Sequence, residues 1–341
     1  MASALARSNS VTVGNQDVAL VASTTVGRGP ISDIAADAET IVVTNFGDNS
    51  IAVLDPENLT LHGGVFAGQP MAVAVCDERA YLAVSSAEYD AVAVVDTNTG
   101  DLIREYPLAF NVTALVASPD AKRVYAARAG DDGVDIAVID VTAERVGTIY
   151  VAKGADVTID ALRLDASGRR LFVAVSDARS SRLLTVDVES SRVRSTLEIG
   201  GPIRGLEIGV DGAAFVLTSD IADGGTLYFV DLVNNKITDT MRVATAPTQL
   251  ALSDDGTRAY VVDYAHVVVV DTDGRAIVSE LAVGARPSAI AISADRLYVA
   301  DYSGGVTAYA VAAATPMLYS QFVDAPSLAA PTVRELARAS A

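Results

Sequence analysis

One short phrase recurs along the chain and constrains its fold more than any other feature: a mostly apolar run of four residues followed by aspartate. A seventh copy, VTAYA at 306–310, lacks the aspartate. Successive copies end 39 to 47 residues apart, which is a typical length for one blade of a repeat built from four strands. The six copies with aspartate are IAVLD (51–55), VAVVD (92–96), IAVID (136–140), LLTVD (183–187), LYFVD (227–231) and VVVVD (267–271).

Each unit holds three further strand-like segments around this phrase. A second strand such as IVVTN (41–45) precedes it, an inner strand such as MAVAV (71–75) comes earlier, and a more polar strand such as RVRSTLEIG (192–200) follows. No long helical pattern interrupts the units. The sequence therefore predicts an all-β, seven-bladed β-propeller with four antiparallel strands per blade, with a β-sandwich or two β domains as the alternative.

The N-terminal part of the chain is the expected closing strand of the ring. DVALVASTTVG (17–27) resembles the outer strands, and the last unit has only three clear strands of its own. Closing the ring with strands from both termini removes the open sheet edge. MLYSQFV (317–323) is the competing candidate. We expect a propeller over 17–323, an N-terminal segment at 1–16, and a tail at 324–341 that is either a short helix or disordered.

Charge and composition exclude several classes of protein. The net charge is −18, from 43 acidic and 25 basic residues, and such a surface repels nucleic acids and anionic lipid headgroups. Cys76 is the one cysteine, so no intramolecular disulfide can form. The start has no secretory pattern, and no apolar run reaches the ~18 to 20 residues of a spanning helix. We expect a cytoplasmic protein without direct membrane insertion.

The stretch IVVTNFGDNSIAVLD (41–55) resembles the repeat of YVTN-family β-propellers, in which a strand, a glycine-containing turn and a strand ending in aspartate follow one another. In weaker form the resemblance extends from about 18 to 311. This family includes surface antigens and lactonase-like proteins. The whole chain is also similar to cytoplasmic seven-bladed propellers of mycobacteria, and that resemblance implies a role beside the mycolic-acid transport machinery of the cell envelope.

Residues that recur at one position of the repeat are expected to be structural. An aspartate before a tight turn accepts N–H bonds from the residues that follow, which explains both sets of recurring aspartates. The strand-end set is Asp55, Asp96, Asp140, Asp187, Asp231 and Asp271, and the inner-turn set is Asp37, Asp77, Asp120, Asp165, Asp211, Asp255 and Asp295. Recurring aromatic residues are expected to pack between blades. They are Tyr81, Tyr125, Phe172, Phe215, Tyr260 and Tyr298.

The candidate binding residues are those that break the repeat on one face of the propeller. The loops between second and third strands share this face with the connections between blades, and they are acidic. Arginine in the connections suits carboxylate or phosphate groups. We therefore expect a cationic funnel inside an acidic rim, although these arginines could instead neutralise neighbouring acids. The candidates are Arg28, Arg204, Arg286, Tyr89, Tyr264, His266 and Tyr302.

Catalytic and metal chemistry find little support in the sequence. No GxSxG motif is present, His62 and His266 are the two histidines, and Cys76 has no evident base. The inner-strand acids that a calcium ion could use are Asp33, Asp156, Asp160 and Glu207. We predict no catalytic residue, no metal site and no cofactor.

The sequence thus favours a non-catalytic scaffold for a protein partner. A membrane transport complex is one such partner, which would hold the chain at the membrane. The alternatives are a lactone or sugar-ester hydrolase that uses the axial pocket and a sensor of a small anionic ligand.

Overall fold

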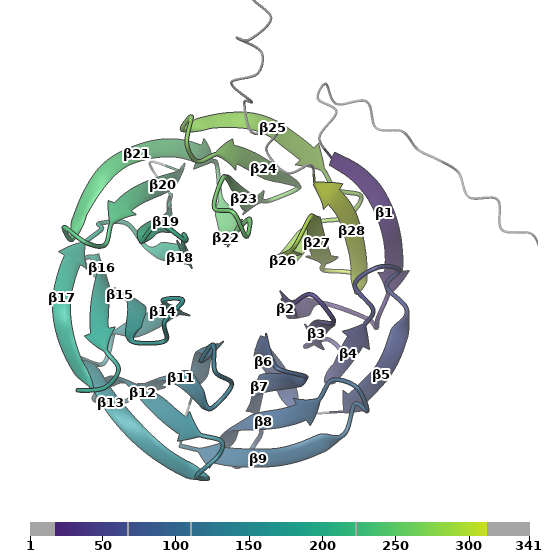
Figure 1. Ribbon diagram of the computed structural model, residues 1–341, viewed down its shortest axis with the longest axis horizontal. Coiled ribbons are helices and arrows are strands. Elements are labelled where there is room, and N and C mark those ends of the chain that lie inside the picture. Colours follow the sequence, from purple (N-terminus) through teal and green to yellow (C-terminus); the bar gives the residue numbers. More distant parts are fainter. Residues whose placement is uncertain (1–17, 67, 110, 222–223, 312–341) are drawn as a thin grey trace, which may run out of the picture. The chain divides into compact units, whose positions relative to one another are not determined.

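The computed structural model describes residues 18–66, 68–109, 111–221 and 224–311. Within these residues the chain forms seven four-stranded antiparallel sheets and no helix. Figure 1 shows the sheets side by side around a central opening, with each sheet running outward from it. The predicted seven-bladed propeller is confirmed. We number the blades 1 to 7 in chain order, beginning with the sheet that contains β2.

Strands take the same order in every blade, from the centre to the rim. The innermost strands are β2 (Ile31–Ala36), β6 (Gln69–Cys76), β10 (Val112–Ala117), β14 (Thr158–Leu164), β18 (Ile203–Ile208), β22 (Pro247–Leu252) and β26 (Pro287–Ser293). The second strands are β3 (Ile41–Asn45), β7 (Arg79–Ser85), β11 (Arg123–Gly130), β15 (Arg170–Ser176), β19 (Ala213–Asp220), β23 (Arg258–Asp263) and β27 (Arg296–Asp301). The third strands are β4 (Ser50–Leu54), β8 (Asp90–Asp96), β12 (Gly133–Asp140), β16 (Ser181–Asp187), β20 (Gly224–Asp231), β24 (His266–Asp271) and β28 (Gly305–Val311). The outer strands are β5 (Leu61–Phe66), β9 (Leu102–Leu108), β13 (Arg145–Lys153), β17 (Arg192–Glu198), β21 (Lys236–Ala244), β25 (Ala276–Ala282) and, for blade 7, β1 (Val18–Thr25).

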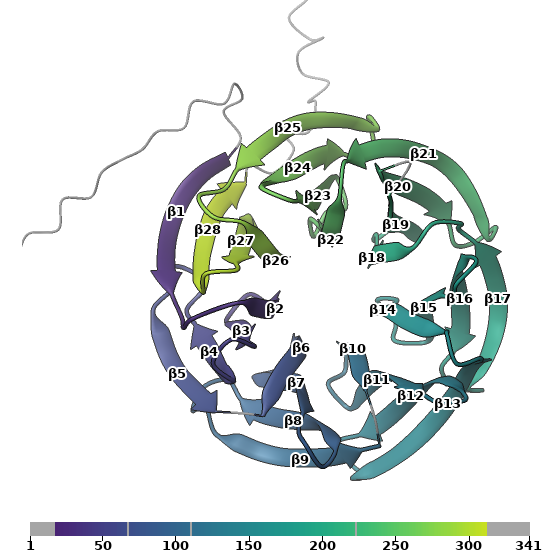
Figure 2. The same cartoon turned by 180° about the vertical axis from the view of Figure 1, so that it is seen from behind.

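The ring closes through β1, as predicted. This strand pairs antiparallel with β28, from Val18 opposite Val311 to Thr25 opposite Gly305. Figure 2 shows β1 at the rim beside β28, from where the chain passes to β2 at the centre. The competing strand at 317–323 lies outside the described residues, as do the predicted segments 1–16 and 324–341.

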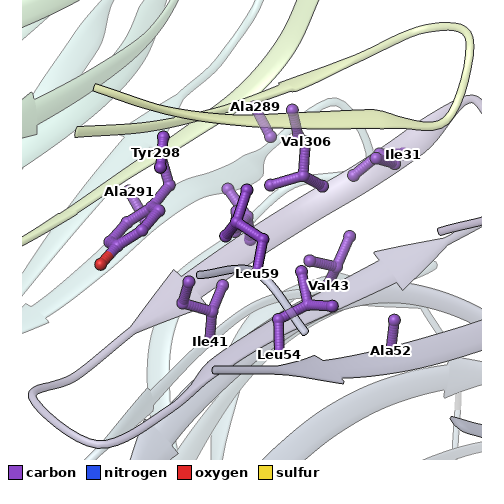
Figure 3. Packing of buried hydrophobic residues seen from close by; sticks show 13 residues of the cluster. Ile31, Ile41, Val43, Ala52, Leu54, Leu59, Ala289, Ala291, Tyr298 and Val306 are labelled. Atoms are coloured by element: carbon purple, nitrogen blue, oxygen red, sulfur yellow. The ribbon is translucent and has the colours of Figure 1, made fainter. Parts of the chain in front are cut away.

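Hydrophobic clusters between neighbouring blades form the core. In the cluster between blades 7 and 1, Val306 and Ala289 face Ile31, Val43 and their neighbours (Figure 3). The recurring aromatic residues are buried, as expected for side chains that pack within and between sheets. They are Tyr81, Tyr125, Phe172, Phe215, Tyr260 and Tyr298, each at most 6% exposed. The free energy of burying these clusters stabilises each blade against the next.

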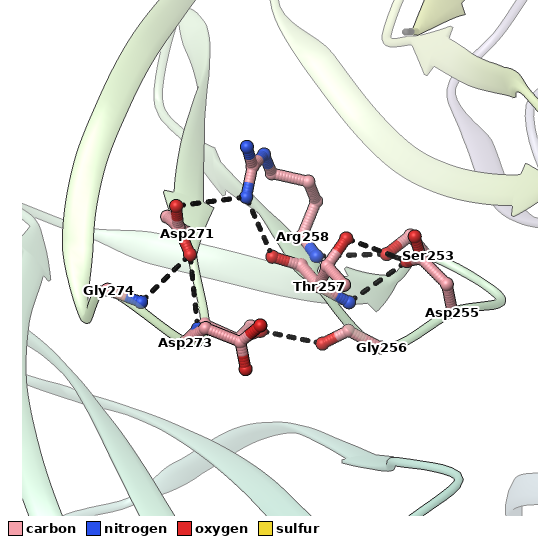
Figure 4. Close-up of polar contacts among 9 residues, drawn as sticks. Ser253, Asp255, Gly256, Thr257, Arg258, Asp271, Asp273 and Gly274 are labelled. Atoms are coloured by element: carbon pink, nitrogen blue, oxygen red, sulfur yellow. Dashed lines mark hydrogen bonds and ion pairs between the residues drawn. The ribbon is translucent and has the colours of Figure 1, made fainter. Parts of the chain in front are cut away.

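The strand-end aspartates organise the turns at the third strands. Each of the six accepts a backbone N–H bond from a residue two or three positions further on. In blade 6, Asp271 accepts the N–H groups of Asp273 and Gly274 and also lies 3.2 Å from Nη1 of Arg258 (Figure 4). These carboxylates are therefore structural, as predicted.

Five of the seven inner-turn aspartates play the same part. Asp37, Asp120, Asp165, Asp211 and Asp255 accept backbone N–H bonds within their turns. The prediction is wrong for the other two. Asp77 and Asp295 lie in two-residue turns, between Cys76 and Arg79 and between Ser293 and Arg296, and make no such bond among the described residues. The inner turns of the other five blades are longer, and there the aspartate is followed by N–H groups of the turn that its carboxylate can accept.

Candidate functional site

A β-bulge at one position of the repeat decides which side chains face the centre of the propeller. Each innermost strand shifts its register against the second strand near its start, which leaves one residue unpaired. The innermost strand ends its sheet, so its free edge lines the channel. We call the seven unpaired residues the mouth ring. They are Ser32, Met71, Thr113, Asp160, Arg204, Thr248 and Ser288.

The channel inside the innermost strands has a volume of about 670 Å³, within the roughly 300–1,000 Å³ range of small-molecule sites. Most of the residues that line it are apolar. They include the small side chains of Ala35, Ala74, Ala251 and Ala291. Among the described residues, charged groups line it from three blades: Asp33 from blade 1, Asp160 and Arg163 from blade 4, and Arg204 and Glu207 from blade 5.

Several polar side chains of the channel connect neighbouring blades. In the mouth ring, the Ser32 hydroxyl donates to the carbonyl of Pro70 (2.8 Å) and the Thr113 hydroxyl donates to the carbonyl of Ile159 (2.9 Å). One residue further along, the carboxylate of Asp33 accepts the N–H of Val73 at 3.0 Å. In each bond the partner belongs to the next blade. These groups hold the innermost strands together at the centre.

Two of the channel carboxyl groups have raised pKa values. Burial raises the pKa of Asp33 from 3.8 to about 6, against the N–H bonds from Val73 and Ile34 and the charge of Arg163, which lower it. Burial also raises the pKa of Asp160, against hydrogen bonds from Ser176 and Thr158 and the charge of Arg204.

Arg163 and Glu207 form a two-pronged ion pair across blades 4 and 5. Arg163 donates from Nε to Oε2 of Glu207 at 3.0 Å and from Nη2 to Oε1 at 2.6 Å. A third bond joins Nη1 to the carbonyl of Leu162 at 2.9 Å. Burial opposes the charge of Arg163, but attraction to Glu207 outweighs it, so the pKa of Arg163 is raised. Such paired geometry fixes both side chains.

Removing one partner of this pair should destabilise the fold. We expect Arg163→Ala to lower the free energy of unfolding by roughly 2 kcal/mol, because the Glu207 carboxylate then loses its charged donors. Urea unfolding measures the change. The double variant Arg163→Ala with Glu207→Ala is expected to lose less than the single variant. Strictly additive losses from the two single substitutions would contradict this coupling.

Outside the channel, two tyrosines clamp an arginine on the face that carries the blade connections. The guanidinium of Arg286 lies 4.7 Å from the ring centre of Tyr264 and 4.6 Å from that of Tyr302. Both rings are exposed, by 63% and 46%. The carbonyl of Arg286 accepts the N–H of Tyr302 at 3.1 Å. We call these three residues the tyrosine–arginine clamp. Stacking orients the guanidinium and leaves its edge, with the N–H donors, open.

A buried carboxylate, that of Asp263, holds the chain next to Tyr264 of the clamp in place. Asp263, 4% exposed, accepts the N–H groups of Thr245 (2.9 Å) and Ala246 (2.8 Å) in the connection between blades 5 and 6. Its Oδ2 lies 3.8 Å from Nε2 of His266, which starts β24. Tyr264 lies in the two-residue turn between Asp263 and His266. Of the predicted residues, His266 is therefore next to the clamp.

Of the other predicted site residues, Arg28 lies beside the loop of Tyr302, where the N–H of Val26 donates to the carbonyl of Gly304 at 2.9 Å, and Arg204 and Tyr89 belong to other blades. Arg28 is in the connection from β1 to β2, where its backbone N–H donates to Asp48 at 3.2 Å. Arg204 is in the mouth ring. Tyr89, 41% exposed, is in a loop of blade 2. The predicted set is thus brought together only in part. The cationic funnel remains a prediction.

Comparison with known proteins finds this architecture in mycobacteria. The chain is 51% identical over 250 residues to a seven-bladed β-propeller protein of Mycolicibacterium smegmatis, covering 72% of this chain and 68% of the relative. It is 30% identical over 328 residues to the seven-bladed β-propeller protein Rv1057 of Mycobacterium tuberculosis, covering 84% of this chain and 83% of the relative. The chain belongs to this family of seven-bladed β-propeller proteins.

No family model matches this seven-bladed β-propeller protein. Among solved structures, hydrazine synthase of Kuenenia stuttgartiensis superimposes on it with a TM-score of 0.75. The match covers 85% of this chain and 97% of the other, at 18% identity. At that identity the likeness shows the fold alone.

Sequence reasoning missed the two-pronged ion pair between Arg163 and Glu207 of this propeller. It named Glu207 as an inner-strand acid but not Arg163 as its partner, although both residues lie three positions after their mouth-ring residues. That shared position in consecutive units was the available signal. The inner-strand assignment of Asp156 is wrong, because the residue precedes β14 in the blade connection.

Cys76 and His62 lie on strands of the propeller, β6 and β5. Cys76 is partly exposed, with Sγ 3.6 Å from the carbonyl of Ser118. Burial raises the pKa of its thiol. His62 lies on β5, with Nε2 3.7 Å from Oδ2 of Asp55.

Among the described residues, no group of three or more histidine, cysteine, aspartate or glutamate side chains is arranged to hold a metal ion. Nor does that part of the chain contain a helix with the length and apolar character needed to cross a membrane.

Proposed function

We propose that this propeller is a non-catalytic scaffold that holds a protein partner on its connection face, with the tyrosine–arginine clamp as the anchor. The observation that carries the proposal is the stacking of Arg286 between two exposed tyrosine rings. Tyrosine and arginine are the residue types that, with tryptophan, contribute most to the affinity of protein interfaces. A stacked arginine loses little further conformational freedom when a partner binds.

The chemistry of the clamp favours a carboxylate of the partner. No acceptor among the described residues takes a hydrogen bond from the guanidinium of Arg286, so its donors are open to a ligand. Arginine binds carboxylates through two parallel bonds. The chain carries a net charge of −18, which opposes a strongly acidic partner surface. One aspartate, glutamate or terminal carboxylate in an otherwise neutral or basic surface fits both conditions.

The resemblance to mycobacterial cytoplasmic propellers extends the proposal to a cellular setting. We propose that the partner belongs to a complex that transports envelope lipids such as mycolates, and that the propeller is an accessory of this complex. The chain would then be cytoplasmic and held at the membrane by its partner.

Affinity purification of the tagged full-length chain from its native host tests the scaffold. We expect a stoichiometric protein partner, whose affinity falls about thirtyfold in Arg286→Gln and in Tyr264→Ala, since loss of such an anchor costs roughly 2 kcal/mol. Surface plasmon resonance with the purified partner measures the affinities.

The matched control is Tyr150→Ala, which removes a tyrosine that is 83% exposed on the outer strand β13. This variant should bind the partner as the wild type does. A chain that purifies alone, or a partner that binds equally well to the Arg286→Gln and wild-type proteins, contradicts the proposal.

A further inference from the structure

One position of the repeat carries an arginine on the face of the propeller opposite the blade connections. We call this the turn face, because it bears the turns from first to second strands and from third to outer strands. The position is the first residue of the second strand. Blade 5 begins this strand with Ala213 and blade 1 with Ile41. The other five blades begin it with Arg79, Arg123, Arg170, Arg258 and Arg296.

Arg296 and Arg170 show what an arginine at this position can do. Nη1 of Arg296 donates to the carbonyl groups of Pro56 (2.8 Å) and Glu57 (2.7 Å), which lie in the turn between β4 and β5 of the next blade. In blade 4 the guanidinium of Arg170 lies 5.5 Å from the ring centre of Phe172, two residues further along the same strand. An arginine here can therefore bridge to the next blade or stack on the aromatic ring of its own blade.

The groove between blades 5 and 6 receives no such side chain from blade 5, where Ala213 lies in its wall. The volume of this groove is about 660 Å³. Phe215 and Phe229 line its inner part, with ring centres 5.6 Å apart in an edge-to-face arrangement. Val210 and Val233 also line it and are 80% and 79% exposed. Such a wall suits the aliphatic stem of a long basic side chain.

Val233 departs from the repeat in the same blade as Ala213. It is the second residue after the strand-end aspartate Asp231. The five other blades that have this aspartate carry a polar residue at that position. Exposed apolar wall and missing arginine therefore coincide in one groove. The five polar counterparts are Glu57, Asn98, Thr142, Glu189 and Asp273.

The charge of this groove is not balanced by its own residues. Four aspartates and one arginine line it, and the arginine, Arg275, is already paired with Asp239 and lies 5.3 Å from the ring centre of Phe229. The corresponding groove between blades 3 and 4 is lined by two aspartates, Lys122 and Arg123, and is neutral. A cation complements only the first of these two grooves. Its four aspartates are Asp211, Asp231, Asp255 and Asp273.

Hydrogen bonds between turns fix both walls of the groove. In blade 5 the N–H of Leu232 donates to the carbonyl of Gly212 at 3.3 Å. In blade 6 the hydroxyl of Thr272 donates to the carbonyl of Gly256 at 2.6 Å, which places Asp273 beside Gly256 (Figure 4). Walls that are held in this way need little reordering when a ligand binds.

We propose that the groove between blades 5 and 6 binds an arginine side chain of a partner protein. Its stem lies between Val210 and Val233, and its guanidinium reaches Asp273 of blade 6, as Arg296 reaches Glu57 of blade 1. The carboxylate of Asp273 is exposed and takes no hydrogen bond or ion pair from a described residue, so it can accept the guanidinium.

The choice of arginine and of a protein partner follows from charge and surface. Arginine stacks on aromatic rings and forms paired bonds to carboxylates, which lysine does not. The net charge of −18 attracts a basic partner surface over a longer range. Val210 and Val233 are exposed well beyond what one side chain would cover, and they offer apolar contact to the residues beside the arginine.

Isothermal titration of the full chain with the peptide acetyl-Gly-Ala-Arg-Ala-Gly-amide tests the groove. The matched peptide carries citrulline, which has the shape of arginine without its charge. We expect the arginine peptide to bind at least about tenfold more tightly than the citrulline peptide. Ala213→Arg should weaken this binding about tenfold or more, because the chain then supplies its own arginine, as five other blades do. Circular dichroism and the melting temperature confirm that the variant is folded.

Two substitutions of acidic residues separate the groove from general attraction to an acidic chain. Asp273→Asn should weaken binding about fivefold. Glu189→Gln removes the same charge at the same position of blade 4 and should bind the peptide like the wild type. Equal binding of the arginine and citrulline peptides would overturn the proposal. So would unchanged binding by Ala213→Arg, or an equal loss in Glu189→Gln and Asp273→Asn.

Agmatine, a free guanidinium compound, distinguishes the occupants. It should bind more weakly than the arginine peptide, because it cannot contact the exposed valines through flanking residues. Tighter binding of agmatine would assign the groove to a small cation and overturn the protein partner. None of these measurements involves the tyrosine–arginine clamp, which lies on the opposite face, so their outcome is independent of the proposed scaffold function.

Discussion

Deletion of residues 1–25 should open the ring and lower the melting temperature by roughly 10 °C or more. The deletion removes β1, which pairs with β28 at seven positions and packs Val18 and Ala22 on the clusters beside it. Net contributions of about 1 kcal/mol per backbone hydrogen bond make the loss several kcal/mol. It also bares the edge of β28, Gly305–Val311, which contains no charged residue. An uncharged bare edge promotes association between chains.

The matched control is deletion of residues 1–17, which leaves all of β1 in place. We expect this variant to have the melting temperature of the wild type and to associate no more than the wild type does. Differential scanning calorimetry and light scattering over a range of concentrations measure both effects. A chain without 1–25 that melts and scatters like the one without 1–17 would show that β1 does not close the ring.

The architecture could be predicted because the repeat compares seven copies of one unit. Aspartates at turns and aromatic residues on second strands recur at fixed positions, so their structural role followed from recurrence alone. The closing strand was predictable because blade 7 lacked a fourth strand of its own and 17–27 resembled the outer strands. The two exceptions, Asp77 and Asp295, depend on turn length, which differs by a few residues between blades and was not evident from recurrence.

The candidate site could be predicted only in part, because it depends on the bulge. A bulge adds one residue to a strand and thereby reverses which side chains face each side beyond it. The position of the bulge was not recognised in the sequence, so Arg163 and Glu207, 44 residues apart, were not identified as partners although they occupy the same position of consecutive units. The clamp was easier to predict. Tyr264, Arg286 and Tyr302 all lie in loops and connections of one face, and only their stacking needed the structure.

The stability of this propeller should depend on pH through Asp33. Its pKa is about 6 in the fold and 3.8 in the unfolded chain, so the folded protein binds more protons between these values. The contribution of Asp33 to the free energy of unfolding is therefore fully present below about pH 4. It is lost as the pH rises to about 6, and for a two-unit shift in pKa the loss is about 3 kcal/mol. Asp160 acts in the same direction, because burial also raises its pKa. Turn aspartates such as Asp187, with a pKa lowered to about 2, act in the opposite direction at lower pH.

A comparison of two substitutions isolates this contribution from the others. Asp33→Asn keeps an acceptor for the N–H of Val73 but cannot ionise, so its stability relative to the wild type should rise by about 3 kcal/mol from pH 4 to pH 8. Gln249→Ala removes the corresponding bond to Ile290 in blade 7, where no charge is involved. It should cost about 1 kcal/mol equally at both pH values. Urea unfolding at each pH measures these differences in the free energy of unfolding. If the Asp33→Asn and wild-type proteins changed in stability equally between pH 4 and pH 8, burial would not be raising the pKa of Asp33.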